Sequence, residues 1–252
     1  MDKTLKSILR YIGNMSNIDI TPYVIDGCKA YVEPFAGSFG AGFNVIEQKY
    51  INRIVLNDKD YHVYNFWYCL KEDVDLLIEN IKSMHNKICN LEYKDAMKVL
   101  EGYSLSKDRF EQAAYEFLYM ENKIIFDSPR NYIKELRLDE DRFIDTSIRL
   151  LETDILNLDY LEIFTLWDNE DTFFMIDPPY NVSKIDKYYR GDCSEFDHVK
   201  LRKRLDTLRG KWIVRYNKEP LTSELYKDVR VLFETSKSMF GTEYIEVYYT
   251  NL

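Results

Sequence analysis

One tetrapeptide carries the residue types best suited to chemistry on an amino group: Asp177-Pro178-Pro179-Tyr180. It follows the apolar run Thr172 to Ile176, which predicts a buried strand. A carboxylate at such a strand end lies where open α/β sheets bind ligands, and two prolines remove backbone donors, so carbonyl acceptors point outward. A tyrosine ring beside these acceptors can stack on a planar base. The motif therefore predicts a site that holds an exocyclic amino group, and a plain strand-ending turn is the alternative.

A glycine-rich turn lies far upstream, between the predicted strands Ala30 to Glu33 and Arg53 to Leu56. It runs from Pro34 to Gly42 and holds three of the nine glycines of the chain. Glycine lets the backbone approach a ligand closely, and amides at a helix start favour an anionic group. Asp58 follows about 20 residues later, the spacing at which an acidic residue meets a ribose in nucleotide-binding units. The pattern predicts a nucleotide-binding turn, although a glycine turn that binds nothing gives the same pattern.

Together, these motifs resemble those of the Dam-like family of adenine-specific DNA methyltransferases, in the order of that family. Leu9 to Gly13 is similar to its N-terminal motif, Glu33 to Gly37 to its cofactor loop, and Thr153 to Ile155 to the segment that meets the cofactor's adenine. The resemblance covers almost the whole chain except residues 61–146. Further matches of spacing are Tyr188, Tyr189, Phe196, His198, Leu201, Leu205 and the closing segment Glu243 to Asn251.

The resemblance implies S-adenosylmethionine as cofactor and a flipped adenine in double-stranded DNA as substrate. The chain differs from the family pattern at two positions: Met15 stands where a lysine is usual, and Phe39 replaces the second glycine of the loop. The implied catalytic residues are Asp177, Pro178, Pro179 and Tyr180. The implied cofactor-binding residues are Tyr11, Gly13, Glu33, Pro34, Phe35, Ala36, Gly37, Ser38, Phe39, Gly40, Asp58, Asp154, Ile155 and Asp177.

The chemistry expected at this site is direct methyl transfer to an amino nitrogen. The Asp177 carboxylate and the Pro178 carbonyl would each accept one N–H of the adenine amino group, while Tyr180 stacks on the ring. The chain has no Pro-Cys dipeptide, which argues against a cytosine-C5 enzyme with a thiolate nucleophile. The alternatives are transfer to cytosine N4 or to RNA, and a non-catalytic protein that binds nucleic acid.

The elements expected to position these residues form a Rossmann-like α/β sheet of seven strands, mostly parallel, with the last two strands antiparallel. The catalytic domain is expected to comprise residues 1–60 and 147–252, and residues 61–146 to form an inserted helical target-recognition domain. The glycine turn is expected to lead into a helix, Phe43 to Tyr50. The predicted strands are Ala30 to Glu33, Arg53 to Leu56, Leu150 to Thr153, Thr172 to Ile176, Lys211 to Arg215, Val229 to Glu234 and Tyr244 to Tyr249.

Composition indicates a folded protein, with 46% apolar and 15% aromatic residues in a chain of 252. No signal-peptide pattern or membrane-length apolar run is present, so a cytoplasmic protein is expected. Four scattered cysteines and three histidines predict no metal site. The net charge of −9 disfavours nucleic acid, but local clusters matter more than the sum.

Two basic clusters stand out against the acidic background. The segment from Lys200 to Lys211 is interpreted as an amphipathic helix with a solvated charged face, buried through Leu201, Leu205 and Leu208. The predicted DNA contacts are in the second cluster, although a solvated helical hairpin is equally consistent with it: Lys123, Arg130, Lys134 and Arg137.

Overall fold

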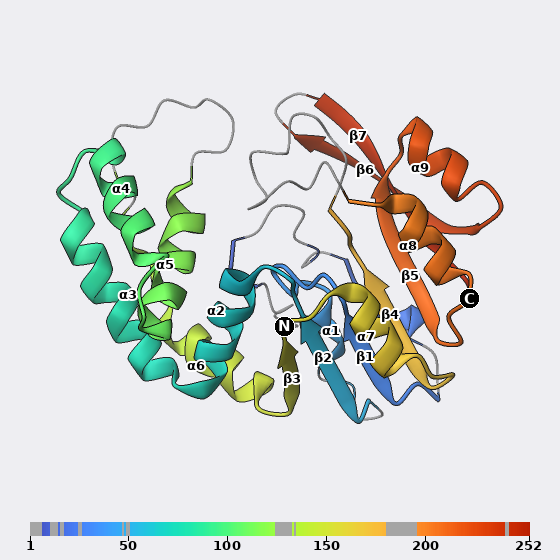
Figure 1. Ribbon diagram of the computed structural model, residues 1–252, viewed down its shortest axis with the longest axis horizontal. Coiled ribbons are helices and arrows are strands. Elements are labelled where there is room, and N and C mark those ends of the chain that lie inside the picture. The colour runs from blue at the N-terminus through green and yellow to red at the C-terminus, as the bar shows by residue number, and fades with distance from the viewer. Residues whose placement is uncertain are drawn as a thin grey trace.

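A computed structural model describes residues 7–10, 15, 18–24, 27–46, 48, 51–123, 133, 135–179, 196–239 and 242–252. Within these residues the strands form one seven-stranded sheet in the order β3-β2-β1-β4-β5-β7-β6. The neighbouring pairs from β3 to β5 are parallel, and β7 pairs antiparallel with both β5 and β6. The predicted α/β fold and the antiparallel final pair are therefore confirmed (Figure 1).

Most strand positions agree with the sequence pattern, and the deviations have simple causes. β5 and β6 extend beyond the predicted runs through segments that contain the polar residues Asn217 and Thr235 to Ser238, and polarity hides a strand from an apolar pattern. The strands are β1 (Ala30–Glu33), β2 (Arg53–Asn57), β3 (Thr153–Leu156), β4 (Thr172–Ile176), β5 (Lys211–Asn217), β6 (Arg230–Met239) and β7 (Thr242–Thr250).

The predicted strand Leu150 to Thr153 was wrong by three residues. Helix α6 (Glu140–Leu150) ends at the first residue of this segment, a turn follows at residues 151–152, and β3 begins only at Thr153. Leu150 is buried in the core at the end of α6, while Ile148 and Leu151 are exposed to solvent. These exposed apolar residues extended the apolar run and imitated a strand.

Helices cover both faces of the sheet. Six of the described helices begin after an aspartate whose carboxylate accepts a hydrogen bond from a first-turn amide, as N-caps do. The predicted helix Phe43 to Tyr50 is wrong in extent, because α1 covers only Gly42–Val45. The other helices are a 3-10 turn (Thr21–Tyr23), α2 (Tyr61–Glu72), α3 (Val74–Ile88), α4 (Tyr93–Tyr103), α5 (Arg109–Asn122), α7 (Tyr160–Trp167), α8 (His198–Leu205) and α9 (Pro220–Leu225).

Side chains alternate between two cores because successive strand residues point to opposite faces. Tyr31 and Phe173 belong to the first core, which also contains residues of α2 to α6. Val32 and Phe174 belong to the second core, which α7 and α8 complete. Whether a residue holds an odd or an even position along its strand therefore decides in which of the two cores its side chain packs.

The segment between β2 and β3 forms a helical unit beside the sheet (Figure 1). Its helices α3, α4 and α5 lie beyond the β3 edge, and α5 packs against α2, α3 and α4. Aromatic rings join α5 to α2 and α6, with the Phe117 centroid 6.2 Å from that of Phe66 and 5.3 Å from that of Phe143. Helix α2 also belongs to the sheet's first core through Trp67. The unit is thus attached to the sheet through α2.

Candidate active site

The turn Asp177-Pro178-Pro179 lies at the carboxyl end of β4, directly after Ile176, and Tyr180 lies outside the described residues. β4 pairs with β1, and from these two strands the sheet extends in opposite directions along the chain. Open α/β sheets bind ligands in the crevice at such a switch point, beyond the carboxyl ends of the strands. The turn therefore occupies the position where this type of fold binds ligands.

The glycine-rich turn leaves β1 at the same edge of the sheet. The Gly37 amide donates a hydrogen bond to Asp58 Oδ2 at 2.9 Å, and the Gly37 carbonyl accepts one from Trp67 Nε1 at 2.9 Å. The Ala36 amide donates to the carbonyl of Asn57 at 2.9 Å. The turn is thus fastened both to the end of β2 and to α2.

Phe39, the residue in place of the second glycine, has its ring inside the protein. Its backbone φ of 53° lies in the left-handed region, which costs a non-glycine residue about 1–2 kcal/mol. The ring is fully buried, with its centroid 5.2 Å from that of Phe43. It also lies against Gly42, where an added Cβ would come within 2.1 Å of the ring. Packing of the ring beneath the turn thus requires glycine at position 42.

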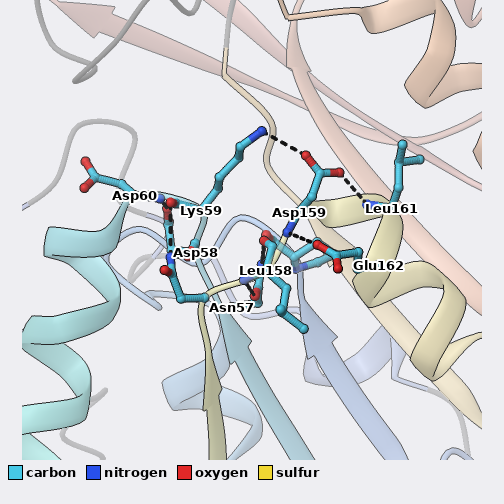
Figure 2. Close-up of polar contacts among 10 residues, drawn as sticks. Asn57, Asp58, Lys59, Asp60, Leu158, Asp159, Leu161 and Glu162 are labelled. Carbon is cyan, nitrogen blue, oxygen red and sulfur yellow. Dashed lines mark hydrogen bonds and ion pairs between the residues drawn. The ribbon is translucent and has the colours of Figure 1, made fainter.

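Asn57 and Asp58 organise the end of β2 (Figure 2). The buried Asn57 amide donates to the carbonyls of Pro34 and Leu158 at 2.9 and 3.0 Å, which joins the turn to the segment before α7. Asp58 accepts the amide of Asp60 at 2.9 Å as well as that of Gly37. Burial raises the pKa of Asp58 to about 7, and the two donated hydrogen bonds oppose this rise.

Glu33, the last residue of β1, is 1% exposed and faces the same core as Tyr31. Its Oε1 accepts a hydrogen bond from the Tyr31 hydroxyl at 2.6 Å, and Oε2 has no partner among the described residues. Burial raises the pKa of Glu33 to about 8, the Tyr31 hydrogen bond opposes the rise, and the nearby Asp177 adds to it. Burial thus favours the protonated form of Glu33, which lies beside Asp177 at the carboxyl end of β1.

Two charged residues that were not predicted belong to the same site. Arg215 on β5 is 2% exposed, with Nη1 3.4 Å from Asp177 Oδ2 and Nη2 3.0 Å from Glu246 Oε1 on β7. Arginine is rarely buried unless it is paired. A charged residue within the apolar run Trp212 to Tyr216 was the sequence signal that could have identified it.

Some predicted cofactor residues are not brought to this edge. Asp154 lies within β3 opposite Val55, and its Oδ2 is 2.5 Å from Nη2 of Arg53, the first residue of β2. Its carboxylate is thus paired near the amino end of β2, whereas Glu33 and Asp177 lie at carboxyl ends. The neighbouring Ile155 packs against the first core. Tyr11 and Gly13 lie outside the described residues.

His198 at the start of α8 has a structural contact. Its Nδ1 lies 2.8 Å from the Tyr216 hydroxyl, which ties α8 to β5, and burial lowers the pKa of His198. The basic segment that follows is an amphipathic helix with Leu201 and Leu205 buried, but the predicted extent was wrong, because α8 ends at Leu205 and Lys211 already begins β5. Arg204 on this helix pairs with Asp168 at 3.5 Å.

The described part of the second basic cluster lies in the helical unit. Lys123 follows α5, with its Nζ 5.2 Å from the centre of the Tyr119 ring, and Arg137 is exposed. Arg130 and Lys134 lie outside the described residues. Across the described part of the chain, no helix is long and apolar enough to cross a bilayer. No His, Cys, Asp or Glu cluster suited to a metal ion occurs among those same residues.

The sheet order, the glycine turn after β1 and the Asp-Pro-Pro turn after β4 define a Rossmann-like methyltransferase fold. Residues 11–240 match the D12 class N6 adenine-specific DNA methyltransferase family, and the chain belongs to this family. It is also 24% identical over 197 residues to the Type II methyltransferase M.MjaIII of Methanocaldococcus jannaschii, an alignment covering 69% of this chain and 68% of that protein. The protein is an enzyme that methylates the N6 amino group of adenine in DNA, which confirms the predicted activity.

Proposed function

We propose that S-adenosylmethionine is the methyl donor and binds across the turn from Glu33 to Gly40. When bound, it supplies a methyl group carried on a sulfonium cation. The fit is supported by Glu33 Oε2, which has no hydrogen-bond partner among the described residues and can bind a polar ligand atom, and by the nearby Asp177, since a carboxylate favours a cationic ligand. Roles for Tyr11, Gly13, Asp154 and Ile155 in cofactor binding stay predictions.

The ribose of the cofactor is assigned to Asp58. Its two oxygens each accept one backbone amide, and a carboxylate offers about four lone-pair positions, so acceptor capacity remains for hydroxyl groups. Asp58 would then hold the glycine turn and the ribose with the same carboxylate. Ionisation of Asp58 strengthens both kinds of hydrogen bond, because charge-assisted bonds are about twice as strong as neutral ones.

Asp177 is assigned to the target base. The lone pair of an adenine amino nitrogen is delocalised into the ring, and acceptors on both N–H bonds make the nitrogen more tetrahedral and more nucleophilic. The Asp177 carboxylate accepts one N–H and the Pro178 carbonyl the other, while Tyr180 stacks on the ring. Because a duplex hides this group, the adenine is flipped out, at a cost of a few kcal/mol that binding in the pocket offsets.

One observation carries this assignment: Asp177 lies at the switch point, beside the turn proposed to hold the cofactor, with its side chain 18% exposed. Asp177→Ala should lower kcat by about a hundredfold to a thousandfold and change the cofactor Kd little. A radiolabelled methyl-transfer assay on duplex DNA, with calorimetry for the cofactor, measures both. Asp171→Ala, at the amino end of the same strand, is the matched control. Near-normal turnover of Asp177→Ala would rule out the mechanism.

We further propose that residues 61–146 select the DNA sequence and contact double-stranded DNA through Lys123, Arg130, Lys134 and Arg137. The proposal is supported by the position of this helical unit beyond the β3 edge, attached through α2 next to the glycine turn. The similarity to a Type II methyltransferase supports a place for the enzyme in a restriction-modification system in the cytoplasm.

A further inference from the structure

A row of charged side chains crosses four neighbouring strands at the carboxyl edge of the parallel strands. The residues are Glu33 on β1, Asp177 after β4, Arg215 on β5 and Glu246 on β7. Each lies two positions from a side chain of the first core, namely Tyr31, Met175, Ile213 and Tyr248. Because side chains alternate along a strand, the four charged groups therefore share one face of the sheet.

Arg215 is the centre of this row. Its guanidinium reaches Asp177 Oδ2 at 3.4 Å with Nη1 and Glu246 Oε1 at 3.0 Å with Nη2. The Glu246 carboxylate is itself held in place, because its Oε2 accepts hydrogen bonds from the hydroxyls of Thr235 and Tyr248, each at 3.3 Å. Arg215 is thus anchored on the β7 side by groups from two strands, β6 and β7.

Stability does not account for an arginine at this position. Removing two opposite charges from water costs several kcal/mol per ion, and well-packed apolar residues are often as stable in their place. The network opens to solvent at one end, since Asp177 is 18% exposed whereas Arg215 and Glu246 are 2% and 4% exposed. The buried charges therefore act on the group at the open end.

We propose that Arg215, anchored by Glu246, is a positioning residue that fixes the orientation of the Asp177 carboxylate toward the target amino group. This inference rests on the role of Asp177 proposed above. The geometry supports this role, because the guanidinium lies 3.4 Å from Asp177 Oδ2 and is held on its other side by Glu246 at 3.0 Å.

The test is a double-mutant cycle between positions 215 and 177. Arg215→Met is combined with Glu246→Gln, so that no carboxylate is left buried without its cation, and thermal unfolding checks the fold. The single-turnover methyl-transfer rate of this pair should fall about tenfold or more, with the Kd for S-adenosylmethionine within about twofold of wild type. Arg215→Lys keeps the positive charge but loses the planar guanidinium that contacts two carboxylates at once, and it should retain an intermediate rate. Arg204→Met, a half-buried arginine paired with Asp168, is the matched control.

In an Asp177→Asn background, the same pair of substitutions should change the remaining rate by less than about twofold, because the group through which Arg215 acts is already altered. An equal loss of rate in both backgrounds would overturn the inference and leave the role of Asp177 intact. A wild-type rate for the folded pair would also overturn it. Full activity of Asp177→Asn alone would instead remove the proposed role of Asp177, and this inference with it.

Discussion

At the scale of single residues, the site is defined by the interactions among its buried charged groups. Glu33 and Asp177 are close enough for Asp177 to raise the pKa of Glu33, while Arg215 bridges Asp177 and Glu246. The row thus holds three carboxyl groups and one guanidinium. A sulfonium cofactor with a positive charge suits that environment, because opposite charges attract strongly where water is excluded.

Glu33 also makes stability depend on pH. Its pKa rises from 4.5 to about 8 on folding, so the folded state binds more protons than the unfolded state between these values. The stabilisation from this group is complete below pH 4.5 and is lost as pH rises to 8, at up to about 1.4 kcal/mol per pH unit. Glu33→Gln has no ionisable group at this position and should reduce the fall in the free energy of unfolding as pH rises. Urea unfolding from pH 5 to pH 8 measures this.

An exposed carboxylate provides the control for that experiment. Glu170 pairs with Arg209 at the surface, and Glu170→Gln should keep the wild-type slope of the free energy of unfolding against pH. Equal slopes for Glu33→Gln and wild type would show that Glu33 is ionised in the folded protein at neutral pH.

At the scale of elements, the turn between β1 and α1 depends on neighbours that come later in the chain. Asp58 from the end of β2 holds its Gly37 amide, and Trp67 of α2 donates to its Gly37 carbonyl. Phe39 packs beneath it against Gly42. The conformation offered to the cofactor is thus built by three elements, and α2 links it to the helical unit.

We expect Asp58→Ala to weaken cofactor binding by about 1.5 to 3 kcal/mol or more, because it removes a charged acceptor from both the turn and the ribose. Titration calorimetry with S-adenosylmethionine measures the change in Kd. Asp60→Ala is the control: it removes the N-cap of α2, whose carboxylate accepts the His62 amide, and should lower stability without altering Kd. Unchanged affinity in Asp58→Ala would refute the ribose assignment.

At the scale of the whole molecule, a net charge of −9 must be reconciled with a polyanionic substrate. Many surface cations are neutralised locally, as in the pairs of Arg209 with Glu170 and Lys227 with Glu224. Phosphate contacts need clustered cations, so DNA binding is expected to depend on a small part of the surface. Of the cluster we assign to that role, the described residues Lys123 and Arg137 lie between α5 and α6 in the chain.

Replacing the four basic residues of this cluster with glutamine should weaken binding to all DNA sequences. Each lost phosphate contact should reduce the slope of log K against log salt by about 0.9, and a lost base contact should relax sequence choice at one position. Fluorescence anisotropy at several salt concentrations and mapping of methylated sites measure these effects. The set is Lys123, Arg130, Lys134 and Arg137.

An equal number of exposed cations from the opposite end of the sheet gives the comparison: Lys200, Lys203, Arg209 and Lys227. Their replacement should leave DNA affinity and the methylated sites unchanged. If this second set weakened binding and the first did not, α8 and its surroundings would be the DNA-binding surface and the proposed reader would be wrong.

The sequence by itself determined the features that depend on local pattern. Buried runs marked β1, β2 and β4 to within a residue, since apolar residues of a central strand are contiguous. The Asp-Pro-Pro-Tyr motif and the glycine turn sufficed for the family and the reaction, because their residue types and order are specific. The same local logic failed at β3, where exposed apolar residues at the end of α6 imitated a strand.

Only the tertiary structure decided which distant residues share a site. Arg215 and Glu246 join Asp177 because β5 lies between β4 and β7 in register, and strand order and register are not written in any one segment. Asp154 has a family-like position in the sequence, but its carboxylate pairs with Arg53 across β2 and β3. Burial likewise raised the pKa of Glu33, because desolvation depends on everything packed around a carboxyl and not on its sequence neighbours.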